Sequence, residues 1–166
     1  AAGRRVVELG AGGGLPGLVA ETLGAAEVLL TDGDDRAVQL LRANVAANGS
    51  RASVARLAYG EPVPPGPGPV LVLAADALYL TKQAAPLLKT IASALSTPAD
   101  ACYLAHEPRR AWTFDADRNP VQEPEDEVLA RFCALALADE SLTVAEVPAE
   151  APSPVRLYKI ARRAKS

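Results

Sequence analysis

Short apolar runs and helical patterns alternate along most of this chain. Apolar runs predict strands at residues 5–9, 27–31, 52–60, 70–76 and 101–107. Helical patterns lie between or after them, at residues 15–23, 36–49, 81–95 and 125–138. Strands that alternate with helices are typical of a parallel sheet covered on both faces. We therefore expect an α/β fold with a doubly wound sheet.

The end of the chain breaks this alternation. Two further apolar runs, residues 141–147 and 155–163, follow one another with no helix between them. Parallel neighbours need a crossover connection, so this last pair must be antiparallel. The sequence predicts a mostly parallel sheet that closes with an antiparallel C-terminal hairpin.

Prolines and polar residues mark the connections. The stretch "EPVPPGPGP" at residues 61–69 can form neither a helix nor a central strand. A polar, acidic connection occupies residues 108–124. Neither is long enough to separate two domains, so we expect a single domain over residues 1–166.

Composition narrows the classes of partner. The net charge of −3 and the pI near 5.2 give no basic footprint for nucleic acid. No apolar stretch approaches the roughly 20 residues of a membrane span, and no signal peptide is evident. Cys102 and Cys133 sit far apart in apolar runs, which favours buried thiols in a reducing compartment. We expect a cytoplasmic protein, with the nucleus as an alternative, that contacts neither nucleic acid nor membrane and is a monomer.

The first strand runs into a glycine-rich loop, "VVELGAGGGLPG", at residues 6–17. In a doubly wound sheet, ligands bind at the carboxyl ends of the strands where strand order reverses. Gly10, Gly12 and Gly14 let the backbone approach a ligand, and Asp32 ends the next strand, where a carboxylate can accept both ribose hydroxyls. A nucleoside-containing cofactor is the expected ligand.

Two cofactors compete for this loop. The stretch "GGGLPG" at residues 12–17 satisfies the dinucleotide fingerprint G-x-G-x-x-G. Glu8, however, precedes the first glycine, and a carboxylate at the mouth of the site would repel a pyrophosphate. The ammonium and sulfonium charges of S-adenosylmethionine would suit it, so we expect the methyl donor.

Four motifs in order resemble a known family. "VVELGAGGGLPGLVA", "LLTDGDDRAVQLLRANVAANG", "VARLAYGE" and "VLAADALY" are similar to the seven-stranded, S-adenosylmethionine-dependent methyltransferases of the group that contains non-histone protein-lysine methyltransferases. The resemblance implies a Rossmann-like methyltransferase sheet. It also implies a further segment before the first strand, which is missing here, since the chain contains no methionine and its first strand begins near residue 1.

The resemblance carries roles to individual positions. Around the cofactor it implies Glu8, Gly10 and Gly12 at the methionine part, Asp32 at the ribose, Tyr59 beside adenine where the group usually has tryptophan, and Ala75 beneath the cofactor. At the methyl-acceptor site it implies Asp76 and Tyr79. Our hypothesis is that Asp76 steers and hydrogen-bonds the acceptor amine while Tyr79 lines its channel.

The expected activity is methyl transfer from S-adenosylmethionine to an amine, with the lysine side chain of a protein substrate as the first choice. A small-molecule N-methyltransferase, an NAD(P)-binding oxidoreductase and a non-catalytic cofactor-binding module remain alternatives. Residues 106–107, "HE", begin the zinc protease signature, but the chain has a single histidine. We therefore expect no metal there and interpret His106 and Glu107 as a solvated loop, and the acids of residues 115–127 as a solvated face or a weak attraction for lysine.

Overall fold

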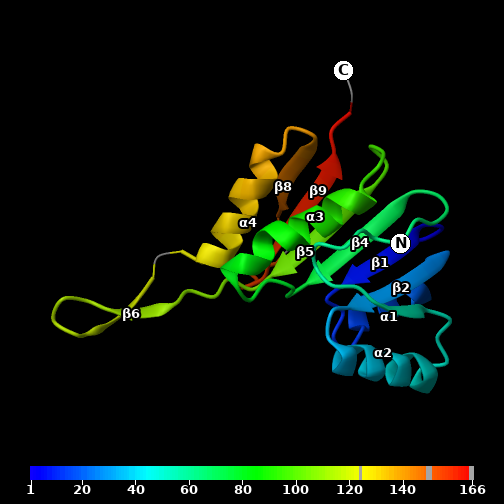
Figure 1. Ribbon diagram of the computed structural model, residues 1–166, viewed down its shortest axis with the longest axis horizontal. Helices are drawn as coiled ribbons and strands as arrows, with labels where there is room; N and C mark the ends of the chain where they lie inside the picture. Colours follow the sequence, from blue (N-terminus) through cyan, green and yellow to red (C-terminus); the bar gives the residue numbers. More distant parts are fainter. Residues whose placement is uncertain (124, 149–150, 165–166) are drawn as a thin grey trace.

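The computed structural model describes residues 1–123, 125–148 and 151–164. Its centre is a seven-stranded sheet with helices packed against it, and a two-stranded hairpin projects to one side (Figure 1). The strands of the sheet are β1 (Arg5–Leu9), β2 (Glu27–Asp32), β3 (Ser53–Arg56), β4 (Val70–Ala75), β5 (Ala101–His106), β8 (Leu142–Val147) and β9 (Arg156–Arg162). The helices are α1 (Leu15–Thr22), α2 (Asp35–Ala47), the 3₁₀ turn η1 (Thr81–Gln83), α3 (Ala84–Ala94) and α4 (Glu127–Ala138).

The order of the strands is β3-β2-β1-β4-β5-β9-β8. β1 pairs in parallel with both β2 and β4, so the chain first builds outward to β3 and then returns to build in the other direction. β9 is antiparallel to both β5 and β8, between which it lies. The predicted fold class is confirmed, including the antiparallel C-terminal pair. The strand order reverses between β1 and β4.

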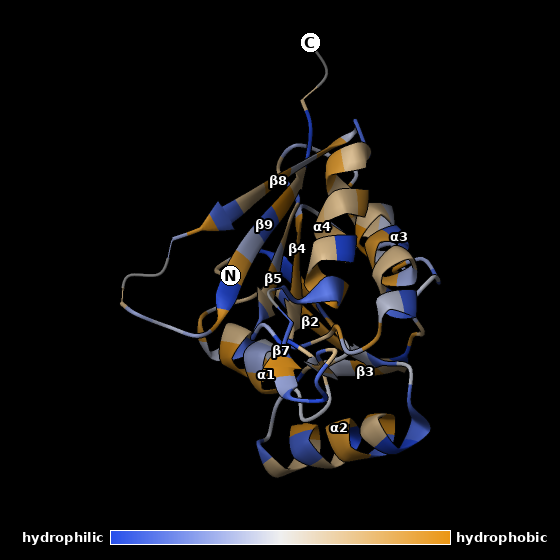
Figure 2. Cartoon of the chain, turned by 90° about the vertical axis from the view of Figure 1, so that its left-hand side faces the viewer, coloured by the Kyte–Doolittle hydropathy of each residue, from blue (hydrophilic) through white to orange (hydrophobic). Residues whose placement is uncertain are grey.

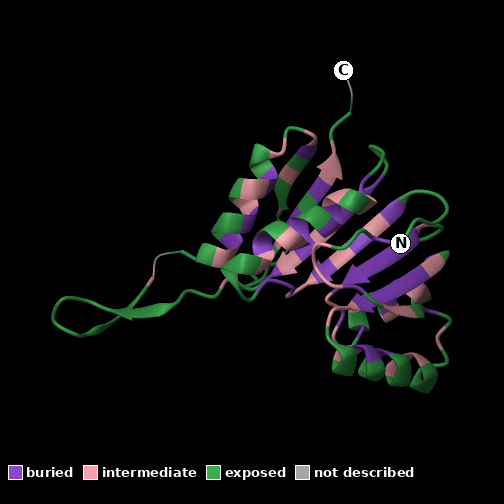
Figure 3. Ribbon diagram, in the orientation of Figure 1, coloured by how far each residue is buried: buried purple, intermediate pink, exposed green. Residues whose placement is uncertain are grey.

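Each face of the sheet has its own apolar core. On one face, α1 and α2 cover a cluster that includes Val6, Leu30 and Leu41. On the other face, α3 and α4 cover a larger cluster that includes Val72 and Phe132. Buried residues follow the central strands, and the outer side of α2 is exposed (Figure 3). By hydropathy, β4 is mainly hydrophobic, whereas hydrophilic and hydrophobic residues are interspersed on α2 (Figure 2). Because strand side chains alternate between faces, Val6 of β1 belongs to the first core and Val7 and Leu9 belong to the second.

The helix boundaries follow local chemistry. Pro16 occupies the first turn of α1, where its missing N–H costs nothing. The carboxylate of Asp34 caps α2 by accepting from Arg36 N and Ala37 N. The neighbouring Asp35 is the first residue of the helix.

The connection at residues 108–124 contains a hairpin that its polar composition did not indicate. Strands β6 (Trp112–Phe114) and β7 (Pro120–Gln122) pair in antiparallel fashion, with Trp112 opposite Gln122. Every residue of both strands is exposed, so there is no buried alternation from which to recognise them (Figure 3).

Within the described residues, no helix is both long and apolar enough to cross a bilayer.

Candidate functional site

A cavity of about 500 Å³ opens where β1, β2 and β4 end. This is the crevice in which open α/β sheets bind ligands, because the strand order reverses there. It is lined by Gly10, Ala11, Gly12, Asp32, Gly33, Asp34, Ala58, Tyr59, Ala75, Asp76, Ala77, Tyr79 and Gln83. Seven of the eight residues to which the resemblance assigns a role therefore line one cavity, and Glu8 is the exception. Gly14, the third glycine expected to approach the ligand, does not line it either.

The glycine loop presents bare backbone to this cavity. Gly12 has a φ of 52°, and a Cβ added there would meet no atom within 4 Å, so its missing side chain leaves open space. Gly10 has a φ of 62°, and a Cβ there would collide with the hydroxyl of Tyr59. The two glycines thus serve different purposes. The absence of a side chain at Gly12 leaves open space in the cavity, and its absence at Gly10 makes space for the Tyr59 hydroxyl.

Asp32 joins the glycine loop to the end of β2. Its Oδ2 accepts from Gly12 N over 3.0 Å, and its Oδ1 accepts from Asp34 N over 2.9 Å. A carboxylate oxygen has two lone pairs, so both oxygens can accept a further hydrogen bond from a group in the cavity.

Glu8 lies behind the loop instead of at the mouth of the site. Its side chain faces the core under α1, only 2% exposed, and its Oε2 accepts from Gly17 N over 2.8 Å. Burial raises the pKa of this carboxyl to about 7, against the opposing effect of the hydrogen bond from Gly17. The expectation that its charge faces the cavity does not hold in this structure, because strand alternation turns Glu8 to the same face as Val6.

Tyr59 ties the loop after β3 to the loop after β4. Its hydroxyl donates to Ala77 O over 3.1 Å, and its ring packs against the α3 and α4 core. Burial raises the pKa of the phenol, so the hydroxyl stays a donor at neutral pH. The aromatic side chain predicted beside the cofactor is therefore held at a fixed place in the cavity wall.

Asp76 follows β4 in a left-handed conformation with a φ of 50°. Its N–H donates to Ala105 O over 2.8 Å, which anchors the turn to the end of β5. Few residues other than glycine adopt this φ, and aspartate and asparagine are among those that tolerate it. The turn aims the carboxylate into the cavity mouth, where Tyr79 Oη donates to Asp76 Oδ2 over 3.2 Å.

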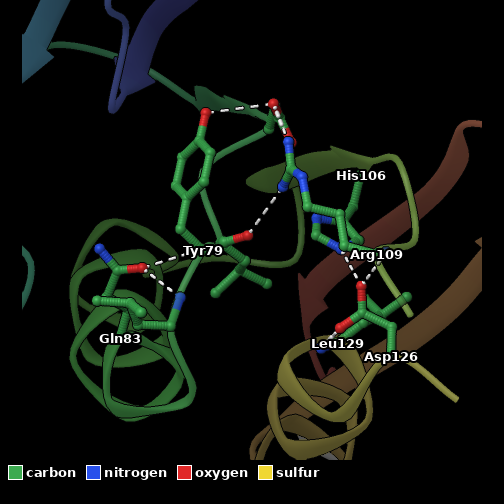
Figure 4. A network of polar contacts seen from close by, with 9 residues as sticks. Tyr79, Gln83, His106, Arg109, Asp126 and Leu129 are labelled. Atoms are coloured by element: carbon green, nitrogen blue, oxygen red, sulfur yellow. Dashed lines mark hydrogen bonds and ion pairs between the residues drawn. The ribbon is translucent and has the colours of Figure 1, made fainter. Parts of the chain in front are cut away.

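Arg109 completes this cluster from the other side (Figure 4). Its Nη2 lies 2.7 Å from Oδ1 and 2.6 Å from Oδ2 of Asp76, and its Nη1 donates to Leu78 O over 3.3 Å. The guanidinium carbon lies 4.7 Å from the centre of the Tyr79 ring, in a cation–π contact. The hydrogen bond from Arg109 is the main cause that holds the pKa of Asp76 below its usual value, so this carboxyl is ionised at neutral pH.

A buried pair fixes the backbone of Arg109. Asp126 Oδ2 accepts from Arg109 N over 2.6 Å and lies 2.9 Å from His106 Nε2 (Figure 4). Asp126 Oδ1 accepts from Leu129 N and caps α4. His106 is 1% exposed, and its Nδ1 has no hydrogen-bond partner among the described residues.

The interpretation of His106 as part of a solvated loop is wrong. His106 is the last residue of β5 and continues the inward alternation of Cys102 and Leu104, which is the signal that could have located it. Asp126, directly before an apolar helix, carries the signature of an N-cap. Arg109 has no such local signal, because only the folded chain brings it to Asp76.

No group of three or more His, Cys, Asp or Glu side chains able to hold a metal ion occurs in residues 1–123, 125–148 and 151–164. Cys102 and Cys133 are free thiols, the first buried and the second partly buried.

Comparison with known proteins supports one family. Residues 1–118 match a family described as lysine methyltransferase. Over 96 residues the chain is 42% identical to protein N-lysine methyltransferase METTL21A of Danio rerio, and this stretch covers 54% of the chain and 43% of that protein. The chain therefore matches less than half the length of this curated relative.

Solved structures share the fold across almost the whole chain. An S-adenosylmethionine dependent methyltransferase from Mesorhizobium loti has a TM-score of 0.65 at 21% identity, covering 98% of this chain and 92% of that one. The glycopeptide N-methyltransferase MtfA, complexed with sinefungin, has a TM-score of 0.65 at 15% identity, covering 97% and 81%. At these identities the likeness concerns the fold alone.

Proposed function

Since the chain belongs to the lysine methyltransferase family, we propose that it transfers a methyl group from S-adenosylmethionine to the side-chain amine of a lysine in a protein substrate. S-adenosylmethionine is the cofactor of this family, as the sequence predicts. What we propose beyond the family and its cofactor is the lysine acceptor, the methyl-transfer activity of this chain and the role of each site residue.

The residues of the cavity fit this cofactor. Gly12 leaves open space at the cavity wall, and the carboxylate of Asp32 keeps acceptor capacity for the hydroxyl hydrogens of a ribose. Tyr59 offers an aromatic wall, and Ala75 a small side chain at the end of β4. The cavity volume of about 500 Å³ also lies within the range of about 300–1,000 Å³ that is usual for small-molecule sites.

One observation carries the proposal above all. Apart from Glu8, the residues assigned to the cofactor and the two assigned to the acceptor, Asp76 and Tyr79, line the same cavity. Methyl transfer is an in-line displacement, so the amine must approach the methyl carbon directly, with water excluded. A continuous cavity allows this approach, whereas two separate sites would not.

When bound, S-adenosylmethionine supplies an electrophilic methyl group on a sulfonium. That methyl group would form a bond to the amine nitrogen as its bond to sulfur breaks, and the pair of electrons would stay on sulfur as a thioether. A lysine amine has an ordinary pKa near 10.4, so freeing its lone pair at pH 7 costs about 4 to 5 kcal/mol. The proton must leave the nitrogen before the displacement.

Asp76 is suited to hold the acceptor amine and is a poor base. Because the pKa of its carboxyl lies below the usual value, it does not retain a proton at pH 7. We assign to Asp76 the orientation of the amine by charge and hydrogen bonding, and to Tyr79 the wall of its channel. Before the displacement, the released proton passes to solvent at the open side of the site, where Tyr79 is 57% exposed and the Asp76 side chain 46%.

The test uses the full-length protein with labelled S-adenosylmethionine and a cell extract. We expect the label on lysine in a protein, and Asp76→Asn should retain cofactor binding while it lowers transfer at least about tenfold. Asparagine tolerates the left-handed backbone of this position, so this variant should fold. Label on a small amine would instead identify a small-molecule N-methyltransferase.

Calorimetry separates the remaining alternatives. We expect binding of S-adenosylmethionine, no binding of NAD(H) or NADP(H), and weaker cofactor binding by Asp32→Ala. Preferential binding of a dinucleotide would overturn the proposal in favour of an oxidoreductase. Cofactor binding without any transfer to protein or small amine would favour a non-catalytic module.

A further inference from the structure

In this structure the carboxylate of Asp76 is paired with a cation of the same chain, the guanidinium of Arg109. Three groups surround the guanidinium of Arg109: the carboxylate of Asp76, the ring of Tyr79 and the carbonyl of Leu78. We name these three groups the acceptor seat. We propose that Arg109 is an internal occupant of this seat and that a substrate amine binds by exchange with Arg109. This inference rests on the proposed function, since it concerns the same amine.

The geometry at Asp76 is one that an ammonium group can reproduce. Arginine usually grips a carboxylate with two nitrogens in a fork, which lysine cannot imitate. Here a single nitrogen, Nη2, lies between both oxygens, at 2.7 and 2.6 Å. A lysine nitrogen at the same point would make both contacts, so the exchange loses none of the hydrogen bonds to Asp76.

The other two groups of the seat also accept any cation. The face of the Tyr79 ring attracts positive charge, and the Leu78 carbonyl accepts a hydrogen bond from guanidinium or ammonium alike. With Arg109 in place, the charge of Asp76 is already compensated. An incoming ammonium must therefore compete with Arg109 for it.

The arginine side chain is free to leave while its backbone is not. The side chains of Arg109 and Asp76 are both 46% exposed, so their separation exposes little new surface. The backbone N–H of Arg109, by contrast, donates to buried Asp126, which also contacts His106 and caps α4. Arg109 thus stays beside the seat as a tethered competitor whose effective concentration is in the millimolar range typical of short tethers.

The consequence is a lower apparent affinity for the acceptor amine. A ligand that binds only the fraction of molecules with an open seat has its dissociation constant raised by the inverse of that fraction. Removal of Arg109 should therefore strengthen amine binding, which is the opposite of what a substrate-binding arginine would do.

The experiment measures binding of n-butylammonium, a mimic of the lysine side chain, to the full-length protein by calorimetry. Arg109→Ala should bind it about tenfold more tightly than the wild type, as expected for release of a mostly occupied seat. Arg110→Ala is the matched control, because this neighbouring arginine is exposed and lines a different cavity from Asp76 and Tyr79, and it should bind like the wild type. Adding Asp76→Asn to Arg109→Ala should remove the gain.

Two further measurements keep the result decisive. Arg109→Gln, which retains the stem without the charge, should repeat the gain if the alanine variant folds poorly. In the wild type, titration with n-butylammonium should shift the NMR signal of Arg109 Nε–H and leave that of Arg110 unchanged. Equal binding by the wild type and the Arg109 variants, or an unmoved Arg109 signal at saturation, would overturn the exchange.

Failure of this inference differs from failure of the proposed function. If the protein transfers no methyl group but the Arg109 variants bind n-butylammonium more tightly, the internal occupant is supported and the proposed reaction fails. The opposite outcome is that lysine methylation occurs, but loss of Arg109 changes neither the binding of n-butylammonium nor the KM for the protein substrate. In that case the proposed function stands, and the proposal that Arg109 is an internal occupant fails.

Discussion

The buried carboxylate of Glu8 accepts a hydrogen bond from Gly17 N over 2.8 Å and so caps helix α1 from a neighbouring strand. The first N–H groups of a helix have no partner inside the helix. The residue at the N-cap position of α1, Gly14, has no side chain to supply one. Glu8 takes this role, which explains why an acid occupies the middle of an otherwise apolar strand.

Stability should fall as the pH rises from about 4.5 to about 7, through the titration of Glu8. Its pKa rises from 4.5 to about 7 on folding, so in this window the folded state binds more protons than the unfolded state. The cost of ionisation reaches about 3 kcal/mol once the pH is above 7. Glu8→Gln keeps an acceptor for Gly17 N and has no charge, so it should lack this loss.

Urea unfolding of both proteins between pH 4.5 and 8 measures the effect. The stability difference between Glu8→Gln and the wild type isolates Glu8 from the other carboxyls, which titrate equally in both. A difference that does not grow toward pH 8 would contradict the buried, raised-pKa carboxyl.

Gly17→Ala should destabilise the protein although alanine is the better helix former. A Cβ at Gly17 would collide with Leu30 and approach Glu8 Oε2 to 2.7 Å. Overpacking of this kind costs about 1–3 kcal/mol, more than the gain of about 1 kcal/mol in helix propensity. Gly13→Ala is the control, since its Cβ would meet only Asn44 Nδ2 at 3.8 Å, and its stability should match the wild type. Equal thermal midpoints for both variants would show that the site under α1 can relax.

The layout of the sheet could be predicted because each strand and helix carries its own pattern. The apolar run of residues 70–76 and the proline-rich loop before it specify β4 without reference to the rest of the chain. The position of Asp32 and Asp76 at the carboxyl ends of their strands then brings both to one crevice. For these residues it was sufficient to combine the local sequence pattern with the rule that ligands bind at the carboxyl ends of strands where the strand order reverses.

The environment of Glu8 and the partner of Asp76 could not be predicted from motifs. Motif position places Glu8 near the cofactor, whereas the two-residue alternation of β1 turns its side chain behind the loop. Arg109 and Asp126 meet because β6 and β7 pair and bring the two ends of their segment together. Every residue of those strands is exposed, so no hydrophobic pattern predicts the contact between Arg109 and Asp126.

Gly10 and Tyr59 should be energetically coupled. Tyr59→Phe removes the hydrogen bond to Ala77 O and should cost about 1 kcal/mol. Gly10→Ala forces a side chain into a left-handed φ and against the Tyr59 hydroxyl. Without that hydroxyl part of the collision disappears, so the double variant should be more stable than the sum of the single effects predicts, as measured by a urea double-mutant cycle. Strict additivity would mean that the hydroxyl does not restrict Gly10.

The single tryptophan should be a poor reporter of folding. Trp112 is 67% exposed on β6, and both hairpin strands lie outside the core. Its iodide quenching should change little between folded and urea-unfolded protein. Trp112→Ala should change the free energy of unfolding by less than about 0.5 kcal/mol, measured by circular dichroism. A strong blue shift or protection from iodide in the folded protein would indicate that the hairpin packs against another surface.

Asp126→Asn should destabilise the protein at neutral pH and much less in acid. The Asp126 carboxylate accepts from Arg109 N and Leu129 N and contacts His106. Although burial alone raises it, these hydrogen bonds hold the pKa of Asp126 below its usual value. A carboxyl whose pKa is lowered on folding adds stability above its unfolded pKa, and that stability is lost as the pH falls through the folded value. Asparagine has one acceptor oxygen and a donor in place of the other, so about 2 kcal/mol should be lost at pH 7.

Asp139→Asn is the matched control for this prediction. Asp139 also has a lowered pKa and accepts from Ser141, but it is only partly buried at the end of α4. Its loss should cost less than about 1 kcal/mol, because water replaces the missing partner. Urea unfolding at pH 7 and pH 3 should show the Asp126→Asn deficit shrinking in acid, since the unfolded wild-type chain, with the ordinary carboxyl pKa of 3.8, then binds a proton more readily than the folded chain. A deficit that is the same at both pH values would mean that Asp126 acts through packing and not through its charge.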